Sequence, residues 1–311
     1  MHSDDYAQFL PPEYRERARV APVSTWWQWR GRRVHIARAE RPEAGVRVLV
    51  LHGGGGHSGA LWPLAAAVAP DRVELLAVDL PLYGATVEPN PRAVRYSDWV
   101  ELVCDLVRAE TARDPRPLVL FGASMGGMLA YEAATRTGAA AHVLATCLLD
   151  PADPAARRAA ARTPAAARLA PALAALEPVL GGVMFPIRLL GDLGRMSANP
   201  ELTRFCARDP RGGGAKVPLG FMAGFLNFRH TAPARYTGPP VTLVHPAEDA
   251  WTPPALSLRV LERIAAPTEA VLLEGCGHFP VERPGLDRLA AVMLRLRDTV
   301  APIGRSTGET S

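Results

Sequence analysis

Short apolar runs alternate with longer amphipathic stretches through the first half of the chain, and this alternation restricts the fold more than any other feature. The apolar runs have the length of strands and the amphipathic stretches have the length of helices. Strands that alternate with helices predict an α/β fold, in which a mostly parallel central sheet carries helices on both faces. The expected strands are 46–51, 73–79, 117–121 and 143–149, and the expected helices are 61–68, 97–109 and 125–135.

The same sheet is expected to gain strands at both of its ends. Residues 26–39 alternate around Gly31 and predict a β-hairpin at the sheet edge, with Trp26, Trp27 and Trp29 buried or half-buried. The strand and helix pattern also resumes near the C-terminus, with strands at 241–244 and 270–273 and helices after Pro253 and at 285–297.

The alternation stops between these two parts, which predicts an insertion. We expect residues 1–150 and 239–301 to form the core, 151–238 to form a helical cap, and 302–311 to be a flexible tail. Residues 155–176 are rich in Ala and Arg and predict short helices that are broken at Pro164 and Pro171. Large apolar side chains then follow, which more often pack a small core than face a substrate: Met184, Phe185, Leu189, Leu190, Met196, Phe205, Phe221, Met222, Phe225, Leu226 and Phe228.

Composition and charge exclude several classes of protein. Hydrophobic residues make up 48% of the 311 residues and charged residues 21%, so a disordered or fibrous chain is not expected. The net charge of +4 comes from scattered arginines without a dense basic run, so no nucleic-acid partner is expected. No apolar run reaches the roughly 18 to 20 residues of a membrane helix, and residues 1–20 lack the apolar centre of a secretory signal. We therefore expect a cytoplasmic protein without stable membrane insertion.

The four cysteines carry no signal of a metal or disulfide site. Cys104, Cys147, Cys206 and Cys276 lie far apart and form no Cys-x-x-Cys pair, which argues against both a zinc site and a disulfide framework. We expect four buried thiols, no metal and no cofactor.

Ser124 lies in the most informative local motif of the chain. Residues 122–126 match G-x-S-x-G, the pattern of a serine held on a strained turn between a strand and a helix. An apolar strand is expected before the motif and a helix after it, and Gly127 provides room where the two pack. The alternative interpretation is a glycine-rich structural turn, which would not require a strand before the motif and a helix after it.

A serine hydroxyl is a weak nucleophile and needs a base that a third group orients. In this arrangement the order along the chain is serine, acid, histidine. Asp249 follows an expected strand and precedes Pro253, and His278 follows the next strand between glycines. We therefore predict Ser124, Asp249 and His278 as the catalytic residues, with Asp150 and Glu248 as weaker candidates for the acid.

Attack on a carbonyl creates an oxyanion that needs preorganised N–H donors. We assign one donor to Met125 and the other to Gly54 or Gly53, in the glycine run after His52. A phosphate-binding loop is the competing interpretation of that run. It lacks both G-x-G-x-x-G and a following Gly-Lys-Ser/Thr.

Four signatures therefore occur in a fixed order: Leu51-His52-Gly53-Gly54-Gly55, the serine motif at 122–126, Asp249 with Pro253, and Gly277-His278 with Glu282 and Pro284. Together they resemble the α/β-hydrolase superfamily, in its branch of esterases and lipases, over about 46–150 and 241–296. The resemblance implies the same three catalytic residues and a cap formed by the insertion. Pro246 departs from the glycine that relatives often have three residues before the acid.

The resemblance implies a serine hydrolase that cleaves a carboxylic ester, or a related acyl bond, of a small apolar substrate without a cofactor. Trp251, Phe279, Met184, Phe185 and Phe225 are the residues that we expect beside the substrate. Thioester, lactone and C–C bond hydrolysis stay open, and so does a ligand-binding receptor on the same fold. Epoxide hydrolases and dehalogenases of this superfamily need an Asp where this chain has a serine, so their reactions are disfavoured.

Overall fold

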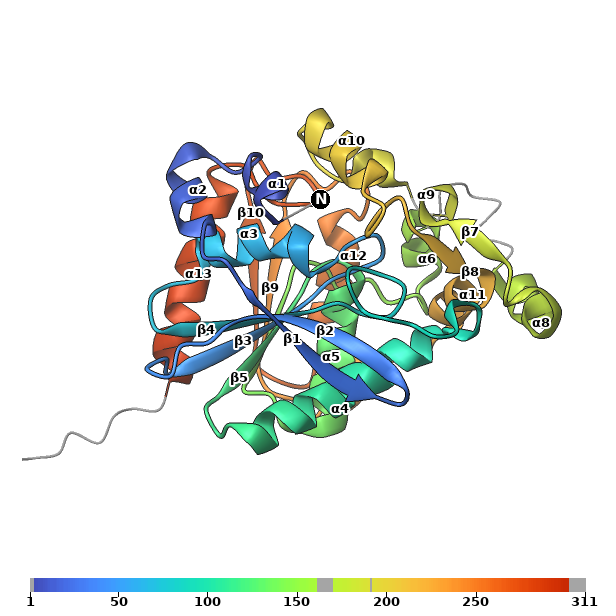
Figure 1. Ribbon diagram of the computed structural model, residues 1–311, viewed down its shortest axis with the longest axis horizontal. Coiled ribbons are helices and arrows are strands. Elements are labelled where there is room, and N and C mark those ends of the chain that lie inside the picture. The colour runs from blue at the N-terminus through green and yellow to red at the C-terminus, as the bar shows by residue number, and fades with distance from the viewer. Residues whose placement is uncertain (1–2, 161–169, 191, 302–311) are drawn as a thin grey trace, which may run out of the picture.

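The computed structural model describes residues 3–160, 170–190 and 192–301. Its centre is an eight-stranded sheet with the order β1-β2-β4-β3-β5-β6-β9-β10 (Figure 1). β1 and β2 are antiparallel, β2 is antiparallel to β4, and every later pairing is parallel. The strands are β1 (Val23–Trp29), β2 (Arg32–Ala39), β3 (Val46–Leu51), β4 (Val73–Val78), β5 (Leu118–Gly122), β6 (His142–Ala145), β9 (Val241–Pro246) and β10 (Thr268–Leu273).

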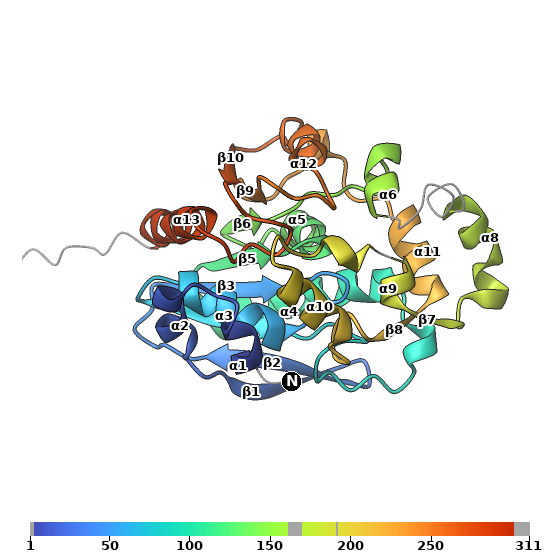
Figure 2. The same ribbon diagram turned by 90° about the horizontal axis from the view of Figure 1, so that it is seen from above.

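Helices cover both faces of this sheet, as the alternation predicts (Figures 1 and 2). Side chains that are successive along a strand point to opposite faces. Val48 and Val50 accordingly pack in one hydrophobic cluster with α3 and α13, whereas Leu49 and Leu51 pack in another with α4 and α5. The core helices are α1 (Ser3–Ala7), α2 (Pro12–Ala18), α3 (Ser58–Val68), α4 (Tyr96–Arg113), α5 (Met125–Thr137), α12 (Pro254–Leu261) and α13 (Gly285–Val300).

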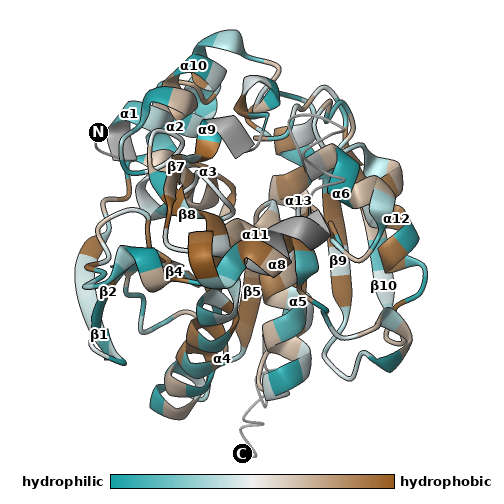
Figure 3. Cartoon of the chain, turned by 90° about the vertical axis from the view of Figure 1, so that its right-hand side faces the viewer, coloured by the Kyte–Doolittle hydropathy of each residue, from teal (hydrophilic) through white to brown (hydrophobic). Residues whose placement is uncertain are grey.

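The segment between β6 and β9 leaves the sheet, and most of it gathers beyond one end of the strands (Figure 1). Figure 3 views this side face-on and shows that α11 is largely hydrophobic, whereas α10 carries hydrophilic residues. The segment contains α6 (Pro154–Ala160), α8 (Ala170–Leu180), β7 (Met184–Pro186), α9 (Ile187–Leu190), α10 (Pro200–Arg208), β8 (Lys216–Pro218) and α11 (Leu219–Asn227).

One expectation for this segment needs correction. It is not wholly helical, because β7 and β8 form a separate antiparallel pair. α8 begins at Ala170, so Pro171 lies in the first turn of a short helix, where proline is tolerated. Residues 161–169, where a break before this proline would lie, are outside the described residues. Pro164 and the expected tail at 302–311 lie outside the described residues.

Two expectations for the sheet are also wrong in detail. The strand expected at 143–149 ends at Ala145, because the chain turns toward α12 and the N–H of Leu148 donates to Oγ of Ser257 at 2.9 Å. Trp26 is 43% exposed, since it lies on the edge strand β1, and the guanidinium of Arg33 covers its ring at 4.7 Å from the ring centre. The hairpin itself and its position at the sheet edge are as predicted.

Candidate active site

Ser124 lies at a tight turn between β5 and α5, at the carboxyl end of the central strands. Its φ of 55° falls in the left-handed region, which a non-glycine residue rarely adopts. The neighbouring glycines permit the turn. A Cβ at Gly122 would lie 2.1 Å from the backbone oxygen of Gly126, and a Cβ at Gly126 would lie 2.1 Å from that of Leu51. The turn therefore presents the serine side chain above the sheet at the cost of local strain.

Substitution of Gly127 tests how tightly α5 packs against the sheet. A Cβ at this position would lie 1.9 Å from the backbone oxygen of Cys147. We expect Gly127→Ala to lower the free energy of unfolding by roughly 1–3 kcal/mol through overpacking, although alanine favours a helix over glycine by about 1 kcal/mol. Urea unfolding measures the difference.

Gly224 in α11 is the matched control for that substitution. A Cβ there would lie 3.5 Å from its nearest neighbour, the backbone nitrogen of Tyr96, which is an ordinary contact. Gly224→Ala should therefore leave stability unchanged or raise it by up to about 1 kcal/mol. Equal effects of the two substitutions would contradict the packing argument.

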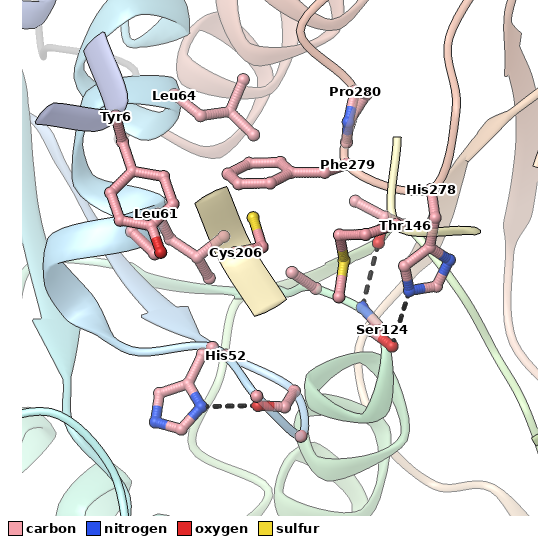
Figure 4. Close-up of a pocket in the computed structure, with 17 residues that line it drawn as sticks. Tyr6, His52, Leu61, Leu64, Ser124, Thr146, Cys206, His278, Phe279 and Pro280 are labelled. Carbon is pink, nitrogen blue, oxygen red and sulfur yellow. Dashed lines mark hydrogen bonds between the residues drawn. The ribbon is translucent and has the colours of Figure 1, made fainter. Parts of the chain in front are cut away.

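His278 connects Ser124 to Asp249 in one hydrogen-bonded chain. Its Nε2 lies 2.9 Å from Oγ of Ser124 (Figure 4), and its Nδ1 lies 2.7 Å from Oδ2 of Asp249. Asp249 follows β9 and His278 follows β10, so the parallel strands bring both loops to the edge where β5 delivers the serine. An acceptor at Nδ1 requires the proton on that nitrogen, which leaves Nε2 free to accept the hydroxyl proton.

Asp249 is held as a carboxylate in a buried position. The N–H groups of Trp251 and Thr252 both donate to its Oδ1 at 2.8 Å, and the Thr252 hydroxyl donates to Oδ2 at 2.7 Å. Burial raises the pKa of this carboxyl, but the charge of His278 and these hydrogen bonds outweigh burial and lower the pKa to about 2. The acid therefore stays ionised at any pH at which an imidazole can act as a base.

The two weaker candidates for the acid lie elsewhere. The side chain of Glu248 is exposed, whereas the neighbouring Asp249 is buried. Asp150 is close to a different histidine, because its Oδ1 lies 3.9 Å from Nδ1 of His230. Of the three carboxylates, the structure brings only Asp249 to His278.

The glycine run after β3 lies directly against the serine turn. A Cβ at Gly53 would lie 2.8 Å from Cβ of Ser124 and 3.0 Å from the backbone nitrogen of Met125. Met125 is the first residue of α5, so its N–H has no acceptor within the helix. The structure thus places Gly53 beside the helix N-terminus, where backbone N–H groups favour negative charge.

The His52 side chain holds this glycine run in place through hydrogen bonds. Its Nδ1 donates to the carbonyl oxygen of Gly53 at 2.8 Å, and its Nε2 accepts the N–H of Leu80 at 2.9 Å. Burial lowers the pKa of His52 to about 4, so the ring is neutral, as this donor and acceptor pattern requires. The histidine therefore ties the end of β3 to the end of β4 and orients the loop.

A second serine in the molecule has almost the same hydrogen-bonding pattern. His35 Nε2 lies 2.9 Å from Oγ of Ser24, and His35 Nδ1 lies 2.8 Å from Oδ2 of Asp79. Ser24, however, lies within the edge strand β1 and not at a turn before a helix N-terminus. The relay alone therefore does not mark an active site. Within the described chain, only Ser124 combines such hydrogen bonds with the strained turn, the glycine run and an adjoining pocket, which makes this serine the candidate nucleophile.

Two apolar pockets meet at Ser124. The first comprises about 580 Å³ of space that no protein atom fills, part of it open to solvent, and we call it the Phe279 pocket (Figure 4). The second has about 500 Å³, and we call it the Met222 pocket. The Phe279 pocket is lined by Tyr6, His52, Gly53, Gly54, Gly55, Gly56, Ala60, Leu61, Leu64, Ala123, Ser124, Thr146, Met196, Cys206, His278, Phe279 and Pro280. The Met222 pocket is lined by Gly54, Ser124, Met125, Leu149, Ile187, Leu193, Met222, Phe225, Trp251 and Thr252.

The pockets contain three of the five side chains expected beside the substrate. Phe279 lines the first pocket, and Trp251 and Phe225 line the second. Met184 and Phe185 line neither, because they lie on β7 and pair with Pro218 and Val217 of β8. Their place in this small sheet separates them from the serine.

Several residues of the site were not anticipated from the sequence. Thr146 accepts the N–H of Ser124 at 3.1 Å and so helps to hold the strained turn. Tyr6 and Cys206 reach the Phe279 pocket from α1 and α10, and no local motif surrounds either of them. The insertion contributes side chains to both pockets, but of the three that we expected from it only Phe225 is among them.

The described residues contain no group of three or more His, Cys, Asp or Glu side chains that could hold a metal ion. All four cysteines are free and buried, as expected. Among the helices that the structure describes, none has the length and hydropathy needed to cross a membrane.

Comparisons with known proteins identify the family and the fold of this chain. The family model described as "Alpha/beta hydrolase family" matches residues 48–291, which is more than half of the chain. Among curated proteins, protein phosphatase methylesterase 1 of Homo sapiens is 32% identical over 120 residues. That stretch covers 38% of this chain and only 30% of the human protein.

Solved structures with the same fold include two lipases. The monoacylglycerol lipase of Paleococcus ferrophilus has a TM-score of 0.67 at 20% identity, over 85% of this chain and 98% of the lipase. A soluble variant of the monoglyceride lipase of Saccharomyces cerevisiae has a TM-score of 0.68 at 15% identity, over 91% of this chain and 96% of the lipase. At these identities the likeness establishes the fold.

Proposed function

Because the chain belongs to the alpha/beta hydrolase family, we propose that it is a serine hydrolase that cleaves a carboxylic ester of a small, largely apolar substrate. The observation that carries this proposal is the continuous chain of hydrogen bonds from Asp249 through His278 to Ser124, at the meeting point of two apolar pockets. The names of the relatives, a methylesterase and two lipases, agree with an ester substrate.

The proposed reaction passes through an acyl-enzyme. Nε2 of His278 takes the hydroxyl proton of Ser124 while Oγ forms a bond to the carbonyl carbon, whose π electrons move to the oxygen. When the carbonyl re-forms, the C–O bond to the alcohol breaks and the leaving oxygen takes the proton from His278. Water then attacks the acyl carbon while His278 takes one of its protons. When the carbonyl re-forms, the bond between this carbon and Oγ breaks, Oγ of Ser124 takes the proton back from His278, and the acid is released. Asp249 stabilises the imidazolium in both halves without itself being protonated.

The oxyanion of each tetrahedral intermediate needs donors close to Ser124. We assign these to the N–H of Met125 and to the glycine run at Gly53 and Gly54, because that backbone lies in contact with the serine turn. The N-terminus of α5 adds a favourable partial positive charge at the same point.

The proposed substrate has two apolar arms, since two apolar pockets adjoin the serine. We infer that the segment 151–238 acts as a cap, because its side chains line both pockets. Leu193, Met222 and Phe225 line the Met222 pocket. Met196 and Cys206 line the Phe279 pocket. Thioesters, lactones and C–C bonds next to a carbonyl need the same nucleophile and remain alternatives.

A substrate panel tests the proposal. Purified protein is incubated with p-nitrophenyl esters, the matching thioesters, lactones and β-diketones, and kcat/KM is measured for each. We expect the esters with apolar arms to be turned over best. Preference for charged, polar esters, or no turnover of any substrate in the panel, would contradict the assignment.

A fluorophosphonate probe separates an enzyme from a ligand-binding receptor on the same fold. The probe phosphonylates a serine that a base activates. We expect stoichiometric labelling at Ser124, located by peptide mass spectrometry. Folded protein that resists labelling would favour a receptor.

Substitution of Gly53 tests the oxyanion assignment. A methyl group there would be forced to within 2.8 Å of Cβ of Ser124, so the glycine run must shift away from the serine. We expect Gly53→Ala to lower kcat by at least about 100-fold, the loss typical of a missing oxyanion donor. Gly45→Ala is the control, because a Cβ at that position would only touch Ala301 at 3.4 Å. Wild-type kcat in Gly53→Ala would refute the role of the run.

A further inference from the structure

The Phe279 pocket ends at Tyr6, which belongs to the first helix of the chain, α1. Figure 4 shows Tyr6 and Leu64 at the end of the pocket that lies away from Ser124 and His278, with Phe279 between. The Tyr6 side chain is part of the packed interior, since the residue is only 4% exposed. It therefore forms the end wall opposite the nucleophile.

The wall is held by aromatic contacts with two other parts of the chain. The Tyr6 ring meets the ring of Phe205 edge-on, with 4.9 Å between centroids, and the ring of Phe279 lies at 6.4 Å. Phe205 belongs to α10, and Phe279 directly follows His278. The ring thus packs between the inserted segment and the loop that carries the proposed base.

Hydrogen bonds to one buried carboxylate fix the ring further. The hydroxyl of Tyr6 donates to Oδ2 of Asp209 at 2.7 Å, and Nε2 of His57 lies 2.7 Å from the same oxygen. Asp209 is 0% exposed and directly follows α10, whereas His57 directly precedes α3. Burial raises the pKa of the Asp209 carboxyl, but the hydrogen bonds from His57 and Tyr6 outweigh burial and lower the pKa to about 2.

This arrangement makes the end wall rigid. A substrate arm that pushed the Tyr6 ring aside would break its hydrogen bond and leave a buried, charged acceptor short of a donor, which is unfavourable. The arm must therefore stop at the ring. Leu61 and Leu64 of α3 line the same pocket, so the walls that an apolar arm would meet there are themselves largely apolar.

We propose that Tyr6 sets the maximum length of the apolar substrate arm that the Phe279 pocket accepts. This proposal rests on the proposed ester hydrolysis, and it names a specificity-determining residue for that reaction. The arm is an unbranched hydrocarbon chain on one side of the ester bond, either the acyl or the alcohol side. The other arm occupies the Met222 pocket.

Two ester series test the proposal. In the first, the acyl chain of p-nitrophenyl esters grows from acetate to decanoate. In the second, the alcohol of acetate esters grows from methyl to octyl. In the wild-type protein, kcat/KM is expected to rise along one series and to fall beyond a limiting length. Each extra buried methylene is worth about fourfold in kcat/KM. Tyr6→Ala should therefore move this limit by two or three carbons and raise the ratio of kcat/KM for long esters to that for short esters about 15- to 60-fold.

Two variants act as matched controls. Tyr6→Phe keeps the ring and its aromatic contacts and loses only the hydrogen bond to Asp209, so the limiting length should move less than in Tyr6→Ala. Met222→Ala opens the other pocket, so it should move the limiting length of the series whose growing arm enters the Met222 pocket and leave the limiting length for the Phe279 pocket unchanged. Tyr6→Leu replaces Tyr6→Ala if the alanine variant does not fold, and a smaller shift in the same direction is expected.

The result that would overturn the proposal is a folded Tyr6→Ala or Tyr6→Leu protein with the wild-type limit in both series. Failure of the underlying function looks different, because the wild-type protein would then hydrolyse no ester of either series. Active wild-type protein with an unmoved limit refutes the role of Tyr6 alone.

Discussion

Replacing Ser124 by alanine is expected to lower kcat for a short p-nitrophenyl ester by roughly 10⁴- to 10⁶-fold, to the level left by binding and oxyanion stabilisation. The substitution removes the hydroxyl that lies 2.9 Å from Nε2 of His278 and that we propose as the nucleophile. Because Ser124 is half-buried at a strained turn, alanine there should not unfold the protein, and circular dichroism and the melting temperature check this. The measurement is steady-state hydrolysis with active-site titration of the wild-type protein.

Ser24→Ala is the control for that experiment. Ser24 also hydrogen-bonds to a histidine that an aspartate holds, but it lies within β1 and outside both pockets at Ser124. We expect wild-type kcat in Ser24→Ala and no fluorophosphonate labelling in Ser124→Ala. Labelling at Ser24, together with activity that survives Ser124→Ala, would show that Ser24 in the edge strand is the nucleophile and would contradict the assignment to Ser124.

The α/β architecture could be predicted because its signals are local. Every expected core strand and helix is present, and most differ from the prediction by only a few residues at their ends. The failures arise where distant contacts decide. The strand expected at 143–149 ends early because Ser257, more than a hundred residues away, binds the backbone of Leu148. The pairing of β7 with β8 joins segments some thirty residues apart, each too short to show strand periodicity.

The meeting of the three proposed catalytic residues could be predicted for a similar reason. Ser124, Asp249 and His278 each follow a strand within a recognisable local motif, and parallel strands must deliver their carboxyl ends to one edge of the sheet. The walls of the pockets have no such motif. Tyr6 is held at its pocket by a hydrogen bond to Asp209, which is 203 residues away along the chain. No motif in the sequence around either residue predicts this contact. The sequence therefore predicted which three residues would meet, whereas the walls of the pockets needed the folded structure.

The same contrast between local motifs and distant contacts explains why the sequence favoured Asp249 as the acid but left Asp150 open. Asp150 and Asp249 both follow strands of the sheet, so the order of motifs permits either as the acid. Their surroundings differ in the folded chain. Asp249 receives the two N–H groups of Trp251 and Thr252 and lies against His278, whereas Asp150 lies near His230.

Substitution of these two aspartates by asparagine should therefore give opposite results. Asn at 249 keeps the shape and can still accept the two N–H groups at Oδ1, so the fold should persist. Its amide N–H₂, however, cannot accept the Nδ1–H of His278, which favours the tautomer with the proton on Nε2 and blocks the transfer from Ser124. We expect kcat to fall by about 10⁴-fold, with KM little changed. Asp150→Asn should keep kcat within a few-fold of wild type, and a reversal of these two effects would move the acid to Asp150.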